Sequence, residues 1–307
     1  MAYPIQSGQP TYSGVMIPEI WSSKLIEQYY DSTVLSKITN TNYEGEIRNQ
    51  GDKVIIRTNP TMEINDYSVG QTLVNQRPVG SVIELLIDKG MYWSAIIDDV
   101  IEKQQDINQM NEWARDAAEQ LKIKLDTRVL AGTVTGVAAA NAGNTAGRLS
   151  ANIPLGATGA PLALDSTNIL ETILNAGQVL DEQNVPETGR YMVMPFWATN
   201  QLKQSDIKAA YLTGDNATPL RNGRVGIVDR FTIYNSNLLP RYVDGTDATT
   251  HFLFGVDYGV TFATQLTKTE SLRAESTFGN IMRGLMVYGF KVIKPEAIGV
   301  VYATQAA

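Results

Sequence analysis

The densest group of side chains that could do chemistry is acidic. Asp98 and Asp99 are adjacent, and Glu102 and Asp106 follow at intervals of three and four residues. Such carboxylates could bind a divalent cation or act as an acid/base pair, which would suit a carboxylate-dependent hydrolase. Adjacent aspartates, however, point in different directions, and no glycine-shaped calcium loop surrounds them. The pattern therefore favours the solvated entry of a helix over a metal or catalytic site.

The other candidate groups are isolated from one another. Residues 244–247 read Asp-Gly-Thr-Asp, which is the composition of an Asx turn. His251, the only histidine, opens the apolar segment 252–254 and is interpreted as a packed residue. Cysteine is absent, which excludes disulfides and thiolate metal sites. We therefore predict no catalytic residue, no metal and no cofactor, and do not predict an enzyme.

The one local cluster of positive charge consists of Arg221, Arg224 and Arg230. It could contact another subunit or a phosphate, or be a solvated face. The chain as a whole is acidic, with a net charge of −7 and a pI near 4.9. Wide phosphate binding needs lysine and arginine, so nucleic acid near this chain is predicted to be enclosed rather than specifically bound.

Size and hydropathy limit the class of protein. The 307 residues, of which 43% are hydrophobic and 19% charged, suit one large domain or two intertwined ones. The first ten residues lack a positive segment and an apolar core, so no signal peptide is predicted. The longest apolar runs, such as 82–87, are too short to cross a membrane, and no membrane partner is predicted.

The N-terminal half contains three recognisable elements. Residues 1–20 are rich in Gly, Pro, Ser and Tyr, so they read as a disordered tail or as an arm that orders on a neighbouring subunit. A helix is predicted to open at Ile17–Trp21, with Pro18 in its first turn. Two β-prone segments, 53–58 and 81–88, predict a hairpin. Their long polar connection is unusual within a compact domain, which suggests that it projects toward another chain.

The strongest helix signal covers residues 106–131. Asp106 is the predicted N-cap, Gln109 completes a capping box, and Gly132 ends the helix. Its apolar stripe consists of Ile107, Met110, Ala114, Ala117, Leu121 and Leu125. Residues 132–164 are mostly small and read as a linker or floppy loop that divides the chain.

The C-terminal half predicts a second set of elements. Asp165 and Ser166 offer a cap for an amphipathic helix with Ile169, Ile173 and Leu180 on its apolar side. A strand at 191–194 stops at Pro195, and a helix covers about 196–204. Short strands and turns follow from 223, and the last strands are 284–294 and 298–302.

Four blocks, in order, resemble the major capsid (coat) proteins of tailed bacteriophages. They are Ile17–Ser22 with Gly51–Ile56, Leu180–Tyr191, Asn222–Pro240 and Gly284–Ala297. The resemblance implies an α+β coat fold of the Hong Kong ninety-seven type. The implied parts are an N-terminal arm and first helix at 1–44, an extended E-loop hairpin at 45–90 and a peripheral domain at 91–164 containing the spine helix. An axial domain at 165–280 and strands returning to the peripheral domain at 281–307 complete it.

The resemblance also implies a function and partners. The chain would be a major capsid protein that self-assembles as hexamers and pentamers into an icosahedral shell enclosing double-stranded DNA. A separate scaffolding protein and a portal are the implied partners, with assembly in the host bacterial cytoplasm and the virion capsid as final location. The candidate residues for subunit interfaces are Trp21, Arg57, Tyr67, Arg77, Arg221, Arg224 and Arg230. Two alternatives stay open, namely a bacterial encapsulin-like nanocompartment shell and the carboxylate-dependent hydrolase.

Overall fold

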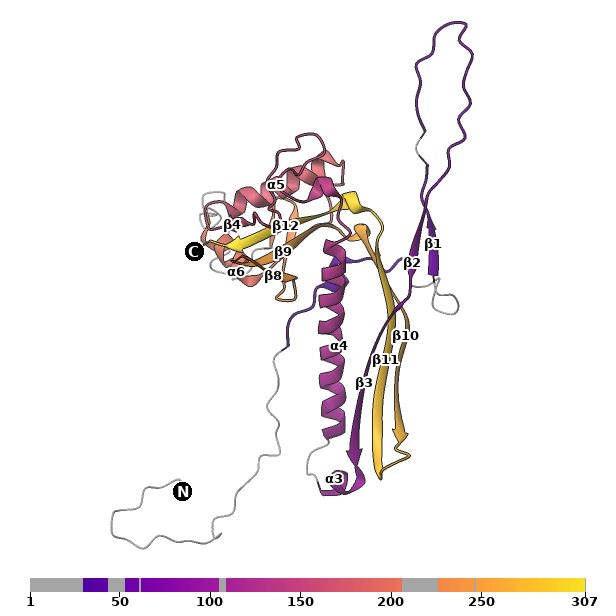
Figure 1. Ribbon diagram of the computed structural model, residues 1–307, viewed down its shortest axis with the longest axis vertical. Helices are drawn as coiled ribbons and strands as arrows, with labels where there is room; N and C mark the ends of the chain where they lie inside the picture. The colour runs from indigo at the N-terminus through magenta and orange to yellow at the C-terminus, as the bar shows by residue number, and fades with distance from the viewer. Residues whose placement is uncertain are drawn as a thin grey trace, which may run out of the picture.

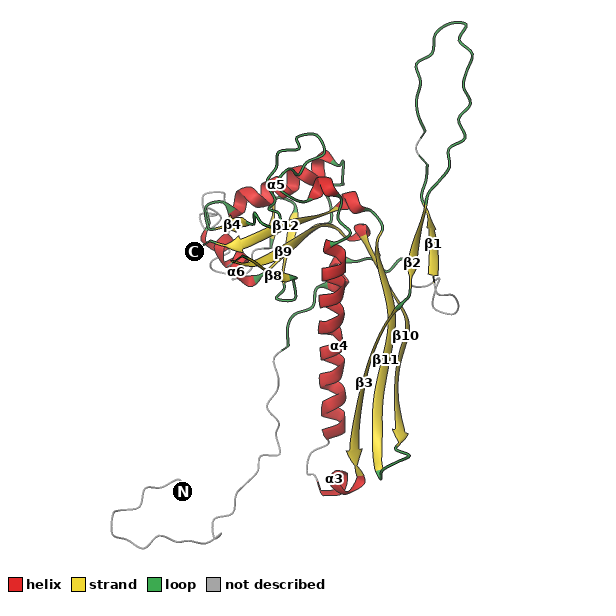
Figure 2. Ribbon diagram, in the orientation of Figure 1, coloured by secondary structure: helices red, strands yellow, loops and turns green. Residues whose placement is uncertain are grey.

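The computed structural model describes residues 30–43, 53–60, 62–104, 109–205, 226–245 and 247–306. Figure 1 shows a long helix beside a narrow sheet, a rounded unit at one end of them, and a thin hairpin that projects away from both. Helices and strands occur in both the long and the rounded unit (Figure 2), so the predicted α+β class is confirmed.

The elongated unit consists of helix α4 (Gln109–Val134) and a three-stranded antiparallel sheet. The strand order is β10 (Val260–Arg273), β11 (Gly279–Val292) and β3 (Lys89–Asp98). The buried core between helix and sheet contains Met91, Leu125, Val129, Phe262 and Tyr288. The short helix α3 (Asp99–Gln104) follows β3 at the far end of this unit (Figure 1).

Helix α4 extends beyond the end of the predicted range, 106–131. The predicted cap, Asp106, lies outside the described residues. Gly132 does not end the helix, which continues to Val134. The ring of Phe290 lies where a side chain of Gly132 would be, since a Cβ added there would stand 2.3 Å from Phe290 Cζ. The glycine thus permits close packing on β11, and Leu121 of the predicted stripe is half-buried against the same seam.

The rounded unit is built on a seven-stranded sheet. Its order is β4 (Leu162–Leu164), β12 (Ile298–Gln305), β9 (Asp247–Val256), β5 (Arg190–Met194), β7 (Phe231–Asn235) and β6 (Ile227–Val228), with β8 (Arg241–Asp244) pairing with β9. Strand β5 is buried along its whole length. Met192 and Met194 face one core and Tyr191 and Val193 face another, so both faces of the sheet are covered.

Helices cover the two faces in different ways. Helices α5 (Ile169–Glu182) and α6 (Phe196–Gln204) pack on the first face. The short helix α1 (Leu35–Ile38) and Leu130 near the end of α4 pack on the second. Asp126 of α4 accepts hydrogen bonds from the backbone N–H groups of Val34 and Leu35, at 2.8 and 2.9 Å. Burial raises the pKa of Asp126, and these two hydrogen bonds oppose the rise. Helix α4 therefore belongs to both units and fixes their relative position.

Two of the implied domain ranges differ from the sheet topology. Residues 260–273 were placed in the axial domain, but they form β10 and pair with β11 of the elongated sheet. Residues 298–305 were expected to return to the peripheral domain, but they form β12 between β4 and β9 of the rounded unit. The short 3₁₀ turns η3 (Asp257–Gly259) and η4 (Pro295–Ala297) mark two of the places where the chain passes between the sheets, from β9 to β10 and from β11 to β12.

The small-residue segment 135–161 is not a floppy linker, and it packs on the rounded unit. Ile153 and Leu155 are buried in the same core as α5. Asn141, in the 3₁₀ turn η1 (Ala139–Asn141), donates from Nδ2 to the carbonyls of Glu296 and Ile298, each at 2.8 Å. The low hydropathy of this segment misled the sequence prediction, because its order comes from buried hydrogen bonds as well as apolar area.

Glu182 at the end of α5 holds this segment in place and makes stability depend on pH. Its carboxylate accepts from the N–H groups of Leu149 and Ser150, and these bonds lower its pKa from 4.5 to about 2. A lowered folded-state pKa adds stability above the unfolded value, and this is lost as pH falls from about 4.5 through about 2. We expect Glu182→Gln to flatten this part of the pH dependence of the unfolding free energy, measured by denaturant titration. A wild-type slope retained in the variant would assign the effect elsewhere.

The predicted hairpin is present. Strands β1 (Lys53–Arg57) and β2 (Val82–Leu86) are antiparallel, in a register that pairs Lys53 with Leu86 and Arg57 with Val82. Val54, Ile56, Leu85 and Ile87 pack on Ala263 of the elongated sheet. The expected end of the hairpin at residue 90 is too late, because Lys89 and Gly90 already belong to β3. The described residues between 58 and 81 form the projecting loop of Figure 1.

Candidate assembly surfaces

The projecting loop, residues 58–81, exposes apolar side chains that a soluble monomer would bury. Val69, Ile64 and Val79 are 98%, 90% and 88% exposed. Further exposed apolar side chains of the loop are Met62, Tyr67, Leu73 and Val74. Large apolar side chains exposed together in this way indicate a site of contact with another protein.

Three of the predicted interface residues lie on this hairpin. Arg57 is exposed at the end of β1, and Tyr67 and Arg77 are exposed in the projecting loop. Neither arginine forms an ion pair with another residue in the described ranges. Trp21, Arg221 and Arg224 lie outside the described residues.

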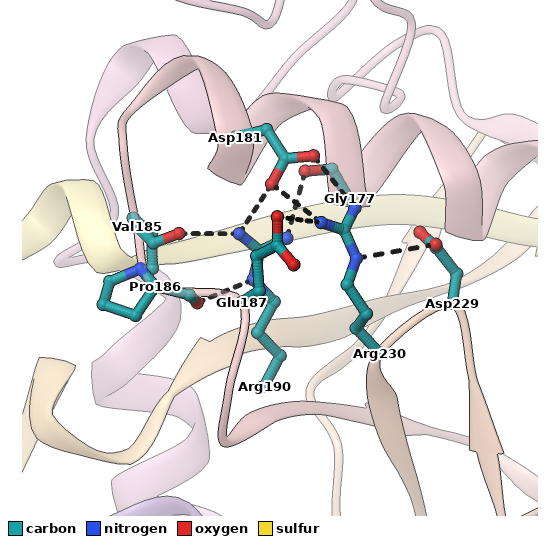
Figure 3. A network of polar contacts seen from close by, with 8 residues as sticks. All are labelled: Gly177, Asp181, Val185, Pro186, Glu187, Arg190, Asp229 and Arg230. Atoms are coloured by element: carbon teal, nitrogen blue, oxygen red, sulfur yellow. Dashed lines mark hydrogen bonds and ion pairs between the residues drawn. The ribbon is translucent and has the colours of Figure 1, made fainter.

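The remaining candidate, Arg230, is engaged within its own chain (Figure 3). Its Nη2 lies 2.9 Å from Oδ2 of Asp181, and its Nη1 lies 3.2 Å from Oε1 of Glu187. The hydrogen bond with Asp181 raises the pKa of Arg230. The arginine has a left-handed backbone, with φ of 67°, which these contacts help to maintain. Its guanidinium therefore fastens the turn before β7 to α5, a role that the sequence analysis did not assign.

Arg190, which the sequence analysis did not single out, shares the same carboxylate. Its side chain is fully buried, and Nη2 donates to Asp181 Oδ1 at 2.6 Å. The backbone carbonyls of Val185 and Pro186 also accept from this guanidinium, at 2.7 and 3.0 Å. Burial opposes ionisation of Asp181, but the hydrogen bonds from the two arginines outweigh it and lower its pKa. The network locks the loop between α5 and β5.

The acidic cluster is held in structural contacts. Both carboxylate oxygens of Asp99 bind the guanidinium of Arg273 on β10, and Asn280 donates to Glu102 at 3.0 Å. The hydrogen bond from Arg273 lowers the pKa of Asp99. Among the described residues no three histidine, cysteine or acidic side chains gather as a metal site would require. Asp106 lies outside those residues. These contacts tie α3 to the end of the elongated sheet.

The second acidic turn and the histidine are also structural. Asp244 ends β8, and its Oδ2 accepts from the N–H of Gly159 at 2.5 Å. His251 lies between the rings of Tyr242 and Tyr302, with centroids 5.1 and 4.6 Å away. Burial lowers the pKa of His251. This packing matches the interpretation drawn from the sequence.

A second exposed surface, which the sequence analysis missed, is the face of the elongated sheet that points away from α4. Tyr92, 82% exposed, stands beside Leu285 in the strand register, and Ile96 stands beside Ile281. The charged side chains of Lys268, Glu270 and Arg283 form ion pairs on the same face. Together with Tyr92 and Leu285 they line a hollow of about 530 Å³. The alternation of residues 91–98 was the signal that could have revealed it.

Comparison with known proteins identifies the family of the chain that carries these surfaces. The sequence profile of a family described as phage capsid protein matches residues 92–303. The chain belongs to the phage capsid protein family.

Solved structures agree with this assignment. The capsid chain matches a structure from Mycobacterium phage Che8 with a TM-score of 0.79 and 25% identity, covering 94% of this chain and 98% of that one. It also matches the capsid of cyanophage P-SCSP1u (TM-score 0.73, 16% identity, 95% and 94% covered). The mature capsid of bacteriophage PhiM1 gives a TM-score of 0.69 at 16% identity, with 93% and 91% covered. No curated protein sequence matches the present chain.

The family confirms the resemblance seen in the sequence. This capsid chain is a major capsid protein, a structural component of the shell of a phage particle. Its place is the virion capsid. Of its described helices, none is both long and apolar enough to span a membrane.

Proposed function

We propose that the chain tiles a closed icosahedral shell by inserting its projecting loop into contacts with neighbouring copies. The observation that carries this is the loop itself, in which residues such as Val69 and Ile64 are almost fully exposed. Heterologous contacts that close form rings, and rings of five and six copies can tile a shell. The exposed face of the elongated sheet around Tyr92 and Leu285 is the second surface that copies would cover.

The partners follow from the same role. The shell would enclose double-stranded DNA without a specific binding surface, in keeping with the net charge of −7. A separate scaffolding protein and a portal would take part, and assembly would occur in the host cytoplasm. Arg57 and Arg77 are proposed as subunit contacts, because each is exposed on the hairpin. The family assignment favours a phage shell over a nanocompartment shell.

Deleting residues 60–79 tests this proposal. The deletion joins Asn59 to Gly80 between Thr58 and Ser81, which are already bonded across the hairpin at 2.9 Å. Asn-Gly is a favoured two-residue hairpin turn, so β1 and β2 should remain paired. We expect a subunit with an unchanged unfolding free energy that forms no shells by light scattering and electron microscopy. Shells of normal size from this variant would contradict the proposal, and an unfolded subunit would place the loop in the intramolecular core.

A further inference from the structure

One side chain of the projecting loop differs from all its described neighbours. Every described residue from 62 to 82 is exposed except Gln76, which is half-buried. Its side-chain Oε1 accepts from the N–H of Glu63 at 3.1 Å, and its Nε2 donates to the carbonyl of Glu63 at 2.9 Å. The amide of Gln76 therefore binds both backbone groups of a residue on the opposite limb, as a paired strand would.

The contact continues the register of the hairpin below it. Arg57 is paired with Val82, and one residue further along each limb Thr58 donates to the carbonyl of Ser81 at 2.9 Å. Moving six residues along the first limb from Arg57, and six back along the second from Val82, leads to Glu63 and Gln76.

The tip obeys the same register. Ser68 lies eleven residues after Arg57, and Gln71 lies eleven residues before Val82. The N–H of Gln71 donates to the carbonyl of Ser68 at 3.0 Å. Gly70 lies between them with a φ of 86°, as the third position of a type II turn requires. The hydrogen bonds between the limbs, among the described residues, thus fall on one set of opposed residues.

Between these contacts the limbs are open. No described residue from 58 to 81 is assigned to a strand, and the limbs bow apart in Figure 1. At the end of the loop next to β1 and β2 the two limbs lie close together, because a Cβ on Gly80 would stand 2.6 Å from the carbonyl oxygen of Thr58. The described part of the loop therefore keeps the register of a hairpin without the continuous series of backbone hydrogen bonds that pairs two strands.

We propose that Gln76 is a positioning residue that holds the two limbs in the register of β1 and β2, so that the loop meets a second copy already ordered. This rests on the proposed role of the loop in assembly. This order would favour association of the subunits through entropy, since a loop ordered before contact loses less conformational freedom on binding. A register also fixes which side chains share a face, because a slip of one residue turns a limb over.

Disulfide trapping in the unassembled subunit tests the register. The chain has no cysteine, so introduced thiols have no competitors. Asn65 and Val74 are opposed in the register, whereas Asn65 and Leu73 are one residue out. We expect the pair Asn65→Cys and Val74→Cys to oxidise at least about 10-fold faster than the pair Asn65→Cys and Leu73→Cys. Equal rates would overturn the proposal.

Replacing Gln76 tests its role in the register. A hydrogen bond contributes about 0.5–1.5 kcal/mol, so Gln76→Ala should speed amide hydrogen exchange at Glu63 by roughly 2- to 10-fold and reduce the difference between the two cysteine pairs. Gln76→Glu keeps the acceptor but loses the donor, so its exchange rate at Glu63 should lie between those of wild type and Gln76→Ala. Asn75→Ala is the matched control, because this exposed amide has no hydrogen bond in the described chain. Unchanged exchange and trapping in Gln76→Ala would refute the assignment.

Assembly is measured separately, so that the two proposals can fail independently. Gln76→Ala should form shells, but roughly 2- to 10-fold more slowly than wild type and than Asn75→Ala, by time-resolved light scattering. Normal assembly of the 60–79 deletion would refute the role of the loop and leave the register result standing. A Gln76→Ala subunit that loses the register yet assembles at the wild-type rate would refute the benefit of ordering.

Discussion

Replacing Arg190 with alanine is expected to destabilise the unassembled subunit by about 3–5 kcal/mol. The guanidinium is fully buried and donates to Asp181 and to the carbonyls of Val185 and Pro186. Removing it leaves those carbonyls without a donor and opens a cavity behind the first residue of β5. Because β5 is the buried strand between β7 and β9, the loss should reach the whole rounded unit. Denaturant titration followed by circular dichroism measures the effect.

Arg230→Ala is the matched control, because Arg230 binds the other oxygen of the same carboxylate. Its side chain is 33% exposed, and its second partner, Glu187, is 72% exposed. Exposed ion pairs contribute about 0–1 kcal/mol, so this variant should lose 1 kcal/mol or less. Equal losses at the two positions would show that the network acts through Asp181 and not through the buried guanidinium.

The elements that local pattern defines were predictable from the sequence. Residues 53–57 alternate, and the structure buries Val54 and Ile56 while Lys53 and Arg57 stay exposed. The helix of Ile169, Ile173 and Leu180 has all three residues buried on one side. In both cases the period of the apolar side chains decides which face is buried, and no distant residue is needed.

The pairing of strands was not predictable in the same way. Residues 298–304 are buried throughout, so both faces of this strand are covered. A continuous apolar run is consistent with such burial, but it does not show which strands lie beside it. Arg190 was missed for a related reason. An arginine after Thr-Gly in a turn reads as exposed, and its burial depends on carbonyls of residues 177, 185 and 186 that only the folded loop presents.

The assembly surfaces show the same division. The projecting loop was predictable because its length is unusual for a connection within a compact domain. The outer face of the elongated sheet was not, since Tyr92 and Leu285 are brought together by the pairing of β3 with β11. Subunit contacts of Arg57, Tyr67 and Arg77 remain predictions, because they involve a second copy of the chain.

Gly289→Ala is the other substitution expected to have a large effect, of about 3 kcal/mol, the upper end of the usual range for overpacking. A Cβ at this position would lie 2.1 Å from the carbonyl oxygen of Leu86 and 2.8 Å from Cδ1 of Ile87. The first of these atoms is backbone, so the end of β2 must move away from β11. The core that Leu85 and Ile87 share with Ala263 would then open.

Gly90→Ala provides the comparison within the same sheet. Gly90 pairs with Val287, and the nearest atom to a Cβ added there is the carbonyl oxygen of Met286 at 4.0 Å, which is ordinary contact. This variant should stay within about 0.5 kcal/mol of wild type. Denaturant titration gives the stability of both subunits, and electron microscopy gives their yield of shells. We expect Gly289→Ala to lose shells even at temperatures where its subunit remains folded, because the base of the hairpin sets the direction in which the loop projects. Equal stability and equal shell yield for the two variants would mean that the close contact at Gly289 does not hold the hairpin.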